Sequence, residues 1–203
     1  MQANVLARAR RHLIRCDPVL ADVIHAVGPC RWGQGQPDLF SGLVRAIISQ
    51  QLSVKAADTI HGRVLELLPD GGRLHAAALR DVPHEALRSA GLSARKAEYL
   101  RDLCGHVVDG TLHLDRLHAL DDDEVIRELT AIRGIGQWTA EMMLMFRLHR
   151  PDVLPLDDVG LQRAVQRAYG LRRKPTAQKL IRLAEPWRPW RTVACWYLWA
   201  TLD

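Results

Sequence analysis

The sequence predicts an all-α fold. Apolar residues recur at the three- and four-residue spacing of a helix along most of the 203-residue chain, whereas the alternation typical of a half-buried strand is scarce. Turns rich in glycine and proline interrupt the helical segments at short intervals. Because 48% of the residues are hydrophobic, the chain can bury a sizeable core, and its length suits one large domain or two small lobes with a cleft.

The helical segments can be placed in order from their apolar spacing and their stop signals. Gly28-Pro29 ends the second helix, residues 69–72 end the fourth, and Asp109-Gly110 follows the sixth. The acidic run at residues 121–124 complements the dipole at a helix start, so we interpret it as a cap rather than a metal site. A helix that is apolar nearly all round follows residue 136, and residues 28–37 predict a loop. We expect helices near residues 3–15, 18–27, 39–50, 54–68, 83–89, 94–108, 122–131, 137–148, 158–169, 176–184 and 189–201.

The charge balance favours a polyanionic partner. The formal net charge is +5, and basic residues cluster at residues 8–11, 172–174 and 188–191, although each cluster can equally be a solvated face. Four cysteines lie far apart, without the spacing of a zinc site or an iron–sulfur cluster, and are typical of free thiols in a reducing compartment. No signal peptide or transmembrane segment is visible, so we expect a cytoplasmic protein without a membrane partner.

A Gly-x-Gly turn between two helices is the most informative motif. Gly134 and Gly136 tolerate positive φ and leave no side chain between the main-chain amides and a ligand. The amides of the turn and of the next helix's first turn, including those of Ile135 and Thr139, can hold a phosphate at the positive end of the dipole. Such a hairpin grips the DNA backbone without reading its sequence. A merely tight helix connection is the alternative interpretation.

Two adjacent aspartates follow a proline-rich loop. We expect Asp157 to be the N-cap of the next helix, so that Asp158 projects from its first turn. The alternative is that both residues are simply acids at a helix start.

Together these segments resemble the helix-hairpin-helix glycosylase superfamily of DNA base-excision repair, most closely its 3-methyladenine-DNA glycosylase II branch. The hairpin with Asp158 carries the resemblance, and residues 47–53, 91–97 and 187–191 agree with it. It implies a two-lobed helical glycosylase fold over residues 1–203, with the hairpin at about 125–148 and a cleft between the lobes. A separate N-terminal β domain is not expected, and the role of residues 1–37 stays open.

The resemblance implies that Asp158 is catalytic, because Leu161 and Arg163 match the pattern that follows the family's aspartate. A carboxylate there would stabilise an oxocarbenium-like sugar or orient the attacking water. Lyase-type relatives have a lysine where Trp138 stands, so the resemblance implies a monofunctional glycosylase. It also implies a base pocket of Trp138, Met142 and Trp199 that accepts alkylated purines such as 3-methyladenine and 7-methylguanine.

The remaining implied roles concern DNA and an ion. Gln51 or Leu52 would fill the gap left by the extruded base, unless Leu52 only packs against its own helix. Trp199 can equally pack in the core, and Arg95 and Lys96 are expected to face solvent. No cofactor is required, although main-chain carbonyls implied by the resemblance could hold a structural Na⁺ or K⁺, namely those of Thr130, Ile132 and Ile135.

Three alternatives remain at this stage. The chain could be a glycosylase for oxidised or mismatched bases, a non-catalytic helix-hairpin-helix protein that only binds DNA, or a basic helical protein that binds RNA. The preferred prediction is a monomer that acts on double-stranded DNA containing alkylated bases, associated with the nucleoid if the source is prokaryotic.

Overall fold

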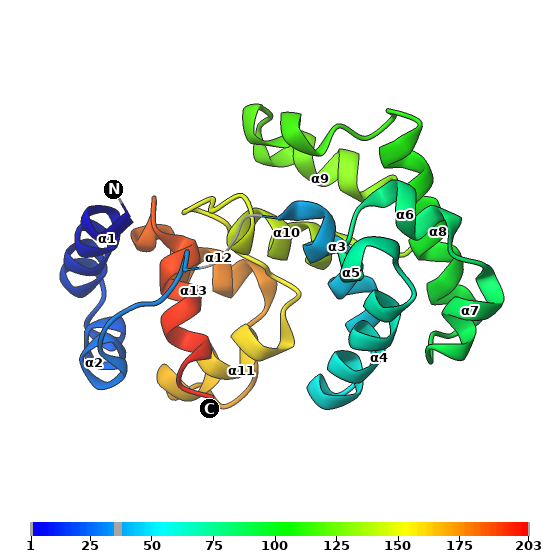
Figure 1. Ribbon diagram of the computed structural model, residues 1–203. Coiled ribbons are helices and arrows are strands. Elements are labelled where there is room, and N and C mark those ends of the chain that lie inside the picture. The colour runs from blue at the N-terminus through cyan, green and yellow to red at the C-terminus, as the bar shows by residue number, and fades with distance from the viewer. Residues whose placement is uncertain (1, 35–37, 203) are drawn as a thin grey trace. The chain divides into compact units, whose positions relative to one another are not determined.

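The computed structural model describes residues 2–34 and 38–202, and every regular element in these ranges is a helix (Figure 1). The all-α prediction is therefore confirmed. The described residues form two compact units: one combines residues before 37 with those from 144 onward, and the other spans residues 38–143. No helix in the described part of the chain has the length and apolar character needed to cross a membrane.

The first unit is built from both ends of the chain. It contains α1 (Gln2–Cys16), α2 (Pro18–Val27), α11 (Val159–Ala168), α12 (Ala177–Ala184), the 3₁₀ helix η2 (Glu185–Trp187) and α13 (Arg191–Trp199). Helix α13, red in Figure 1, packs against α1, α2 and α11 and buries most of its side chains. The first two helices therefore complete this core, which answers the question that the sequence left open for most of residues 1–37.

A buried carboxylate fastens the N-terminal helices to the rest of the first unit. Asp17, which is 8% exposed, caps α2 because its Oδ1 accepts the N–H groups of Val19 and Leu20 at 2.9 and 3.0 Å. Its Oδ2 accepts the Tyr169 hydroxyl at 2.5 Å and the Trp187 indole N–H at 2.9 Å. Four donors thus satisfy one buried carboxylate, as burial of a polar group requires.

The second unit is continuous in sequence. It contains α3 (Leu39–Ser49), α4 (Val54–Glu66), α5 (Pro69–Gly72), α6 (Ala76–Asp81), α7 (His84–Ser89), α8 (Ala94–Val108), the 3₁₀ helix η1 (Leu114–Ala119), α9 (Asp122–Thr130) and most of α10 (Gln137–Phe146). Helix α8 packs against α3, α6 and α7. The acidic run forms a capping box at the start of α9, since Asp121 and Glu124 each accept the other's N–H.

The helix boundaries agree with the sequence pattern to within about two residues, the margin expected of such patterns. Residues 69–72, predicted as a stop, themselves form the short helix α5, and α6, η1 and η2 were not predicted. Elements of three to six residues display little helical periodicity, which explains these omissions, although α7 (also six residues) was predicted at 83–89. Residues 35–37 of the predicted 28–37 loop lie outside the described residues.

Candidate functional site

The Gly-x-Gly hairpin joins α9 to α10 in the second unit. The N–H of Ile135 donates to the carbonyl of Ile132 at 3.1 Å, and Gly134 has a φ of +85°. A Cβ added at Gly134 would lie 2.1 Å from Cδ2 of Tyr99, so both backbone conformation and packing demand glycine there. Gly136 does not adopt a positive φ, so the left-handed conformation that both glycines tolerate is used at Gly134 alone of the two.

Gly136 lacks any packing reason to be glycine, because no described atom lies within 4 Å of an added Cβ. Its carbonyl accepts the N–H of Ala140 at 3.1 Å, which makes Gly136 the N-cap residue immediately before α10. The first-turn amides of a helix have no acceptor within the helix. Ile135 and Thr139 are buried, so they can reach a ligand only through their main chain. Open space lies beside Gly136, where no side chain stands between a ligand and the main chain.

A carboxylate on α8 accepts hydrogen bonds from the residue that precedes Gly134 of the hairpin. Asp102 accepts the main-chain N–H of Arg133 at 2.9 Å and its Nε–H at 2.8 Å, and Nε2 of His106 lies 3.7 Å away. Burial alone would raise the pKa of Asp102, but the donors of Arg133, together with His106, hold it below the ordinary value. Sequence reasoning missed this residue, since 31 positions separate the partners and no motif links them.

The turn between α3 and α4 is tied to the same hairpin. The side-chain amide of Gln50 donates to the carbonyl of Gly134 at 2.7 Å. The ammonium of Lys96 donates to the carbonyls of Ile48 and Gln50 at 2.7 and 2.6 Å, and burial lowers the pKa of Lys96. The expectation that Lys96 faces solvent is therefore wrong, because it satisfies carbonyls at the C-terminal end of α3. Arg95 is exposed as expected.

The two candidate wedge residues occupy the tip of this turn. Gln51 has a φ of +57°, which is uncommon for a residue with a side chain, and it is exposed. Leu52 is 39% exposed. A hollow of about 650 Å³ lies between the turn, the start of α8 and the hairpin, lined by Gln50, Gln51, Ser93, Arg95, Lys96, Tyr99, Gly134 and Trp138. Trp138 exposes 47% of its surface, and Met142 is half-buried one turn further along α10.

Asp158 lies in the first unit, at the start of α11. Its Oδ1 accepts the N–H of Leu161 at 2.5 Å, which makes Asp158 the N-cap of this helix. The same oxygen accepts the indole N–H of Trp199 at 2.9 Å. The prediction that Asp157 is the cap is wrong, because α11 begins one residue later than expected, at Val159, and Asp157 is exposed. Asp158 is partly buried, with its carboxylate held by two helices.

Trp199 and Gly160 complete the surroundings of the carboxylate. The ring of Trp199 is half-buried and lies 5.9 Å from that of Phe146, at an interplanar angle of 37°. A Cβ added at Gly160 would lie 3.1 Å from Oδ1 of Asp158 and 3.4 Å from Nε1 of Trp199. Because Gly160 has no side chain, the Trp199 indole and the Asp158 carboxylate can form their hydrogen bond without crowding. The interpretation of Trp199 as a core residue alone is too simple, because its N–H has a specific acceptor.

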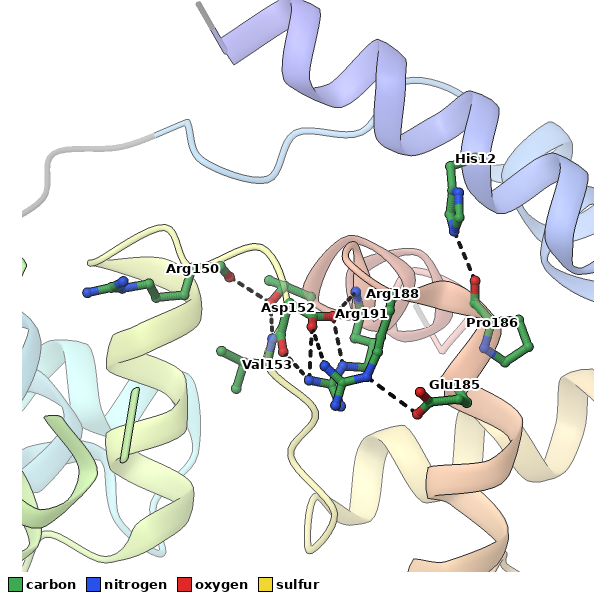
Figure 2. Close-up of polar contacts among 9 residues, drawn as sticks. His12, Arg150, Asp152, Val153, Glu185, Pro186, Arg188 and Arg191 are labelled. Carbon is green, nitrogen blue, oxygen red and sulfur yellow. Dashed lines mark hydrogen bonds and ion pairs between the residues drawn. The ribbon is translucent and has the colours of Figure 1, made fainter. Parts of the chain in front are cut away.

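The loop before Asp158 is anchored by the start of α13. Oδ1 of Asp152 accepts Nε–H of Arg191 at 2.7 Å, and its Oδ2 accepts Nη1–H of Arg188 at 2.8 Å (Figure 2). Arg188 also pairs with Glu185 at 3.4 Å. The basic cluster at residues 188–191 is therefore largely neutralised by acids within its own unit, and sequence reasoning did not find this role.

Comparison with known proteins identifies the family. The model described as HhH-GPD superfamily base excision DNA repair protein matches residues 44–189, which include the hairpin and Asp158. The chain belongs to this superfamily. The predicted resemblance is thus confirmed, although the HhH-GPD match ends before Trp199.

Similar HhH-GPD proteins include the DNA-3-methyladenine glycosylase 1 of Schizosaccharomyces pombe, 34% identical over 199 residues that cover 97% of this chain and 87% of that protein. A crystal structure of a DNA-3-methyladenine glycosidase from Bacillus halodurans has a TM-score of 0.80 and 44% identity, covering 93% of this chain and 85% of that one. A structure of the S. pombe 3-methyladenine DNA glycosylase in complex with abasic DNA has a TM-score of 0.83 and 34% identity, covering 96% of each chain.

The main-chain carbonyls of Thr130, Ile132 and Ile135 lie along the segment from the end of α9 through the hairpin. Among the described residues no group of three or more His, Cys, Asp and Glu side chains could hold a metal ion. Thr130 is the last residue of α9, and the carbonyls of a helix's last turn accept no N–H from within the helix. The carbonyl of Ile132 already accepts one N–H and retains a second lone pair. Carbonyl oxygens are hard ligands, unlike the thiolate and imidazole groups that hold zinc and copper.

Proposed function

We propose that this chain is a monofunctional DNA glycosylase that removes alkylated purines, including 3-methyladenine and 7-methylguanine, from double-stranded DNA in base excision repair. One observation carries the catalytic part of the proposal: the carboxylate of Asp158 is held by Leu161 and Trp199 at the start of α11. The names of the similar proteins support the choice of substrate.

In this proposal Asp158 stabilises the sugar as the base leaves. Cleavage of the N-glycosidic bond builds positive charge on the sugar, as in other glycoside hydrolyses. A carboxylate at about 4 Å and an effective dielectric constant near 20 attracts that charge by roughly 4 kcal/mol. Asp158 also orients or deprotonates the water that attacks the sugar. Because its rotamer is fixed by two N–H donors, little reorganisation is needed when the charge develops.

Trp138 explains why the reaction stops at base removal. An indole stands in the first turn of α10, where a lysine would be needed to form a Schiff base with the sugar. The product is therefore an abasic site in an uncut strand. An exposed indole face also favours a cationic alkylated purine by about 0.5–2 kcal/mol. Met142, one turn along the same helix, contributes to the width of the base pocket.

DNA is held through main-chain atoms of the hairpin, Gly134 to Gly136 and the amide of Thr139, with Gln51 or Leu52 filling the gap left by the extruded base. Both units act together as one glycosylase domain, and the protein works as a monomer. A Na⁺ or K⁺ bound by the carbonyls of Thr130, Ile132 and Ile135 would stiffen the hairpin. Binding should weaken steeply with added salt, because phosphate contacts release counterions.

Chromatography of bases released from methylated duplex DNA tests the proposal. The wild-type protein should release 3-methyladenine or 7-methylguanine and leave the strands uncut until the abasic sites are cleaved chemically. Asp158→Asn should abolish release yet retain binding to duplex DNA, whereas Asp157→Asn, at the exposed neighbour, is the matched control and should stay active. Release of oxidised bases alone, or full activity of Asp158→Asn, would contradict the proposal.

A further inference from the structure

Helix α13 meets the segment that leads to Asp158 at two separate places, one at each end of the helix. We propose that α13 thereby sets the position of the Asp158 carboxylate, and that Thr192 and Trp199 are positioning residues for base release. The inference rests on the proposed function of Asp158. It gives Thr192 a catalytic consequence, and it gives the indole N–H of Trp199 a role beyond the base-pocket role that the resemblance implies.

The first anchor is at the C-terminal end of α13. Trp199, the last residue of the helix, donates its indole N–H to Oδ1 of Asp158 at 2.9 Å. The absence of a side chain at Gly160 leaves room for this contact, since an added Cβ would lie 3.1 Å from the accepting oxygen. The hydrogen bond fixes the carboxylate relative to α13, while the N–H of Leu161 fixes it relative to α11.

The second anchor is at the N-terminal end of α13. The hydroxyl of Thr192 donates to the carbonyl of Arg150 at 2.7 Å and accepts the N–H of Val153 at 3.0 Å. The main-chain N–H of Thr192 donates to the carbonyl of Pro151 at 2.9 Å. Thr192 has no exposed surface, so solvent cannot replace these bonds at low cost. Figure 2 shows this loop beside the Arg191–Asp152 ion pair, which holds the same turn.

The chain between the two anchors is short. Only residues 154–157 separate Val153 from Asp158, and the proline among them restricts the backbone further. A displacement at either anchor is therefore passed on to the carboxylate rather than absorbed by slack in the loop. Catalytic geometry is sensitive to such displacements, since a misplacement of about 1 Å can cost about 100-fold in rate.

Thr192→Val and Thr192→Ser form a matched pair that tests the second anchor. Valine has the shape of threonine but removes both hydroxyl contacts, whereas serine keeps them. We expect single-turnover release of 7-methylguanine from methylated duplex DNA to slow by about 10- to 100-fold in Thr192→Val and by less than about 3-fold in Thr192→Ser. The dissociation constant for undamaged duplex DNA should change by less than about 3-fold in both variants, because the bonds of Thr192 go to residues 150–153, for which no DNA contact is proposed.

Trp199→Phe tests the first anchor, since phenylalanine retains an aromatic ring and removes the N–H donor. Its release rate should also fall by about 10-fold or more with unchanged DNA affinity. Leu180→Ala is a control for instability, because Leu180 is fully buried on α12 and has no hydrogen bond to the loop. Release by Leu180→Ala should be close to that of the wild type at temperatures where it is folded.

The outcomes separate the inference from the proposed function. Wild-type release rates in folded Thr192→Val and Trp199→Phe would overturn the inference alone, and so would an equal loss in Thr192→Ser and Thr192→Val. If Thr192→Val does not fold, Trp199→Phe decides, because its half-buried side chain lies at the end of the helix. Failure of the wild-type protein to release any alkylated base would instead refute the proposed function.

Discussion

The two glycines of the hairpin should respond in opposite ways to the same substitution. In Gly134→Ala the new Cβ would lie 2.1 Å from the Tyr99 ring, at a residue whose φ is +85°. In Gly136→Ala it would meet no described atom within 4 Å. Stability should therefore suffer in the first variant. In the second, only the approach of a ligand to the backbone should suffer.

The size of each effect follows from these contacts. Placing an alanine in the left-handed region costs about 1–2 kcal/mol, and overpacking against Tyr99 adds about 1–3 kcal/mol. A loss of about 2–5 kcal/mol corresponds to a Tm lower by about 4–20 °C for a chain of this length. Gly136→Ala should change stability by less than about 1 kcal/mol. Losing one charge-assisted hydrogen bond to a phosphate should weaken DNA binding by about 10- to 100-fold.

Thermal unfolding and fluorescence anisotropy with a duplex containing an abasic analogue measure the two effects separately. Gly136→Ala should unfold with the wild-type protein and bind the duplex poorly. Wild-type affinity in this variant would refute the idea that a phosphate approaches the hairpin backbone closely. An unchanged Tm in Gly134→Ala would show that Tyr99 can move aside without cost, which would contradict the packing argument.

Three further predictions concern the second unit. Asp102→Asn should cost about 1–3 kcal/mol in the free energy of unfolding and weaken DNA binding, since Arg133 loses a charged acceptor. The pKa of Asp102 is lowered in the folded protein, so the ionised carboxylate stabilises the fold above about pH 4 and this contribution is lost as the pH falls below it. The free energy of unfolding of Asp102→Asn should therefore decrease less on acidification than that of the wild-type protein. Trp138→Ala should reduce release of 7-methylguanine by about 2- to 30-fold, and Trp138→Phe should restore part of it in the same chromatographic assay. Leu52→Ala and Gln51→Gly identify the wedge, because only the variant that loses the inserted side chain should extrude the base more slowly. A fluorescent base analogue in the duplex measures that rate. Gln51→Gly should also raise the Tm slightly, because glycine adopts the positive φ of this position without strain.

The long helices could be predicted because each buries one face over several turns. Helices α2 and α8 have the predicted limits, and Ser93 caps α8 as its position at a helix start indicates. The short helices α5 and α6 were not found in this way, because fewer than two turns display little periodicity. The pairing of α13 with the first two helices was equally invisible, since periodicity reports which face is buried and not what covers it.

The candidate site was predictable where adjacent residues act together. The hairpin glycines and Trp138 stand in one local pattern, and the sequence places them correctly in the turn before α10 and in its first turn. The sequence pattern assigned the N-cap to Asp157 instead of Asp158, because it placed the start of α11 one residue too early. Lys96, Asp102 and Thr192 act on segments more than 30 positions away, and no local pattern reports such contacts.

The division of the chain has a consequence for its synthesis. All partners of the second unit have been translated by residue 143, so that unit can condense while the ribosome is still at work. The first two helices emerge earlier but must wait for Tyr169, Trp187 and α13 before their interior is complete. For much of its elongation, the nascent polypeptide therefore leaves uncovered the apolar side chains of Leu13, Leu20 and Ile24, which are buried in the finished unit.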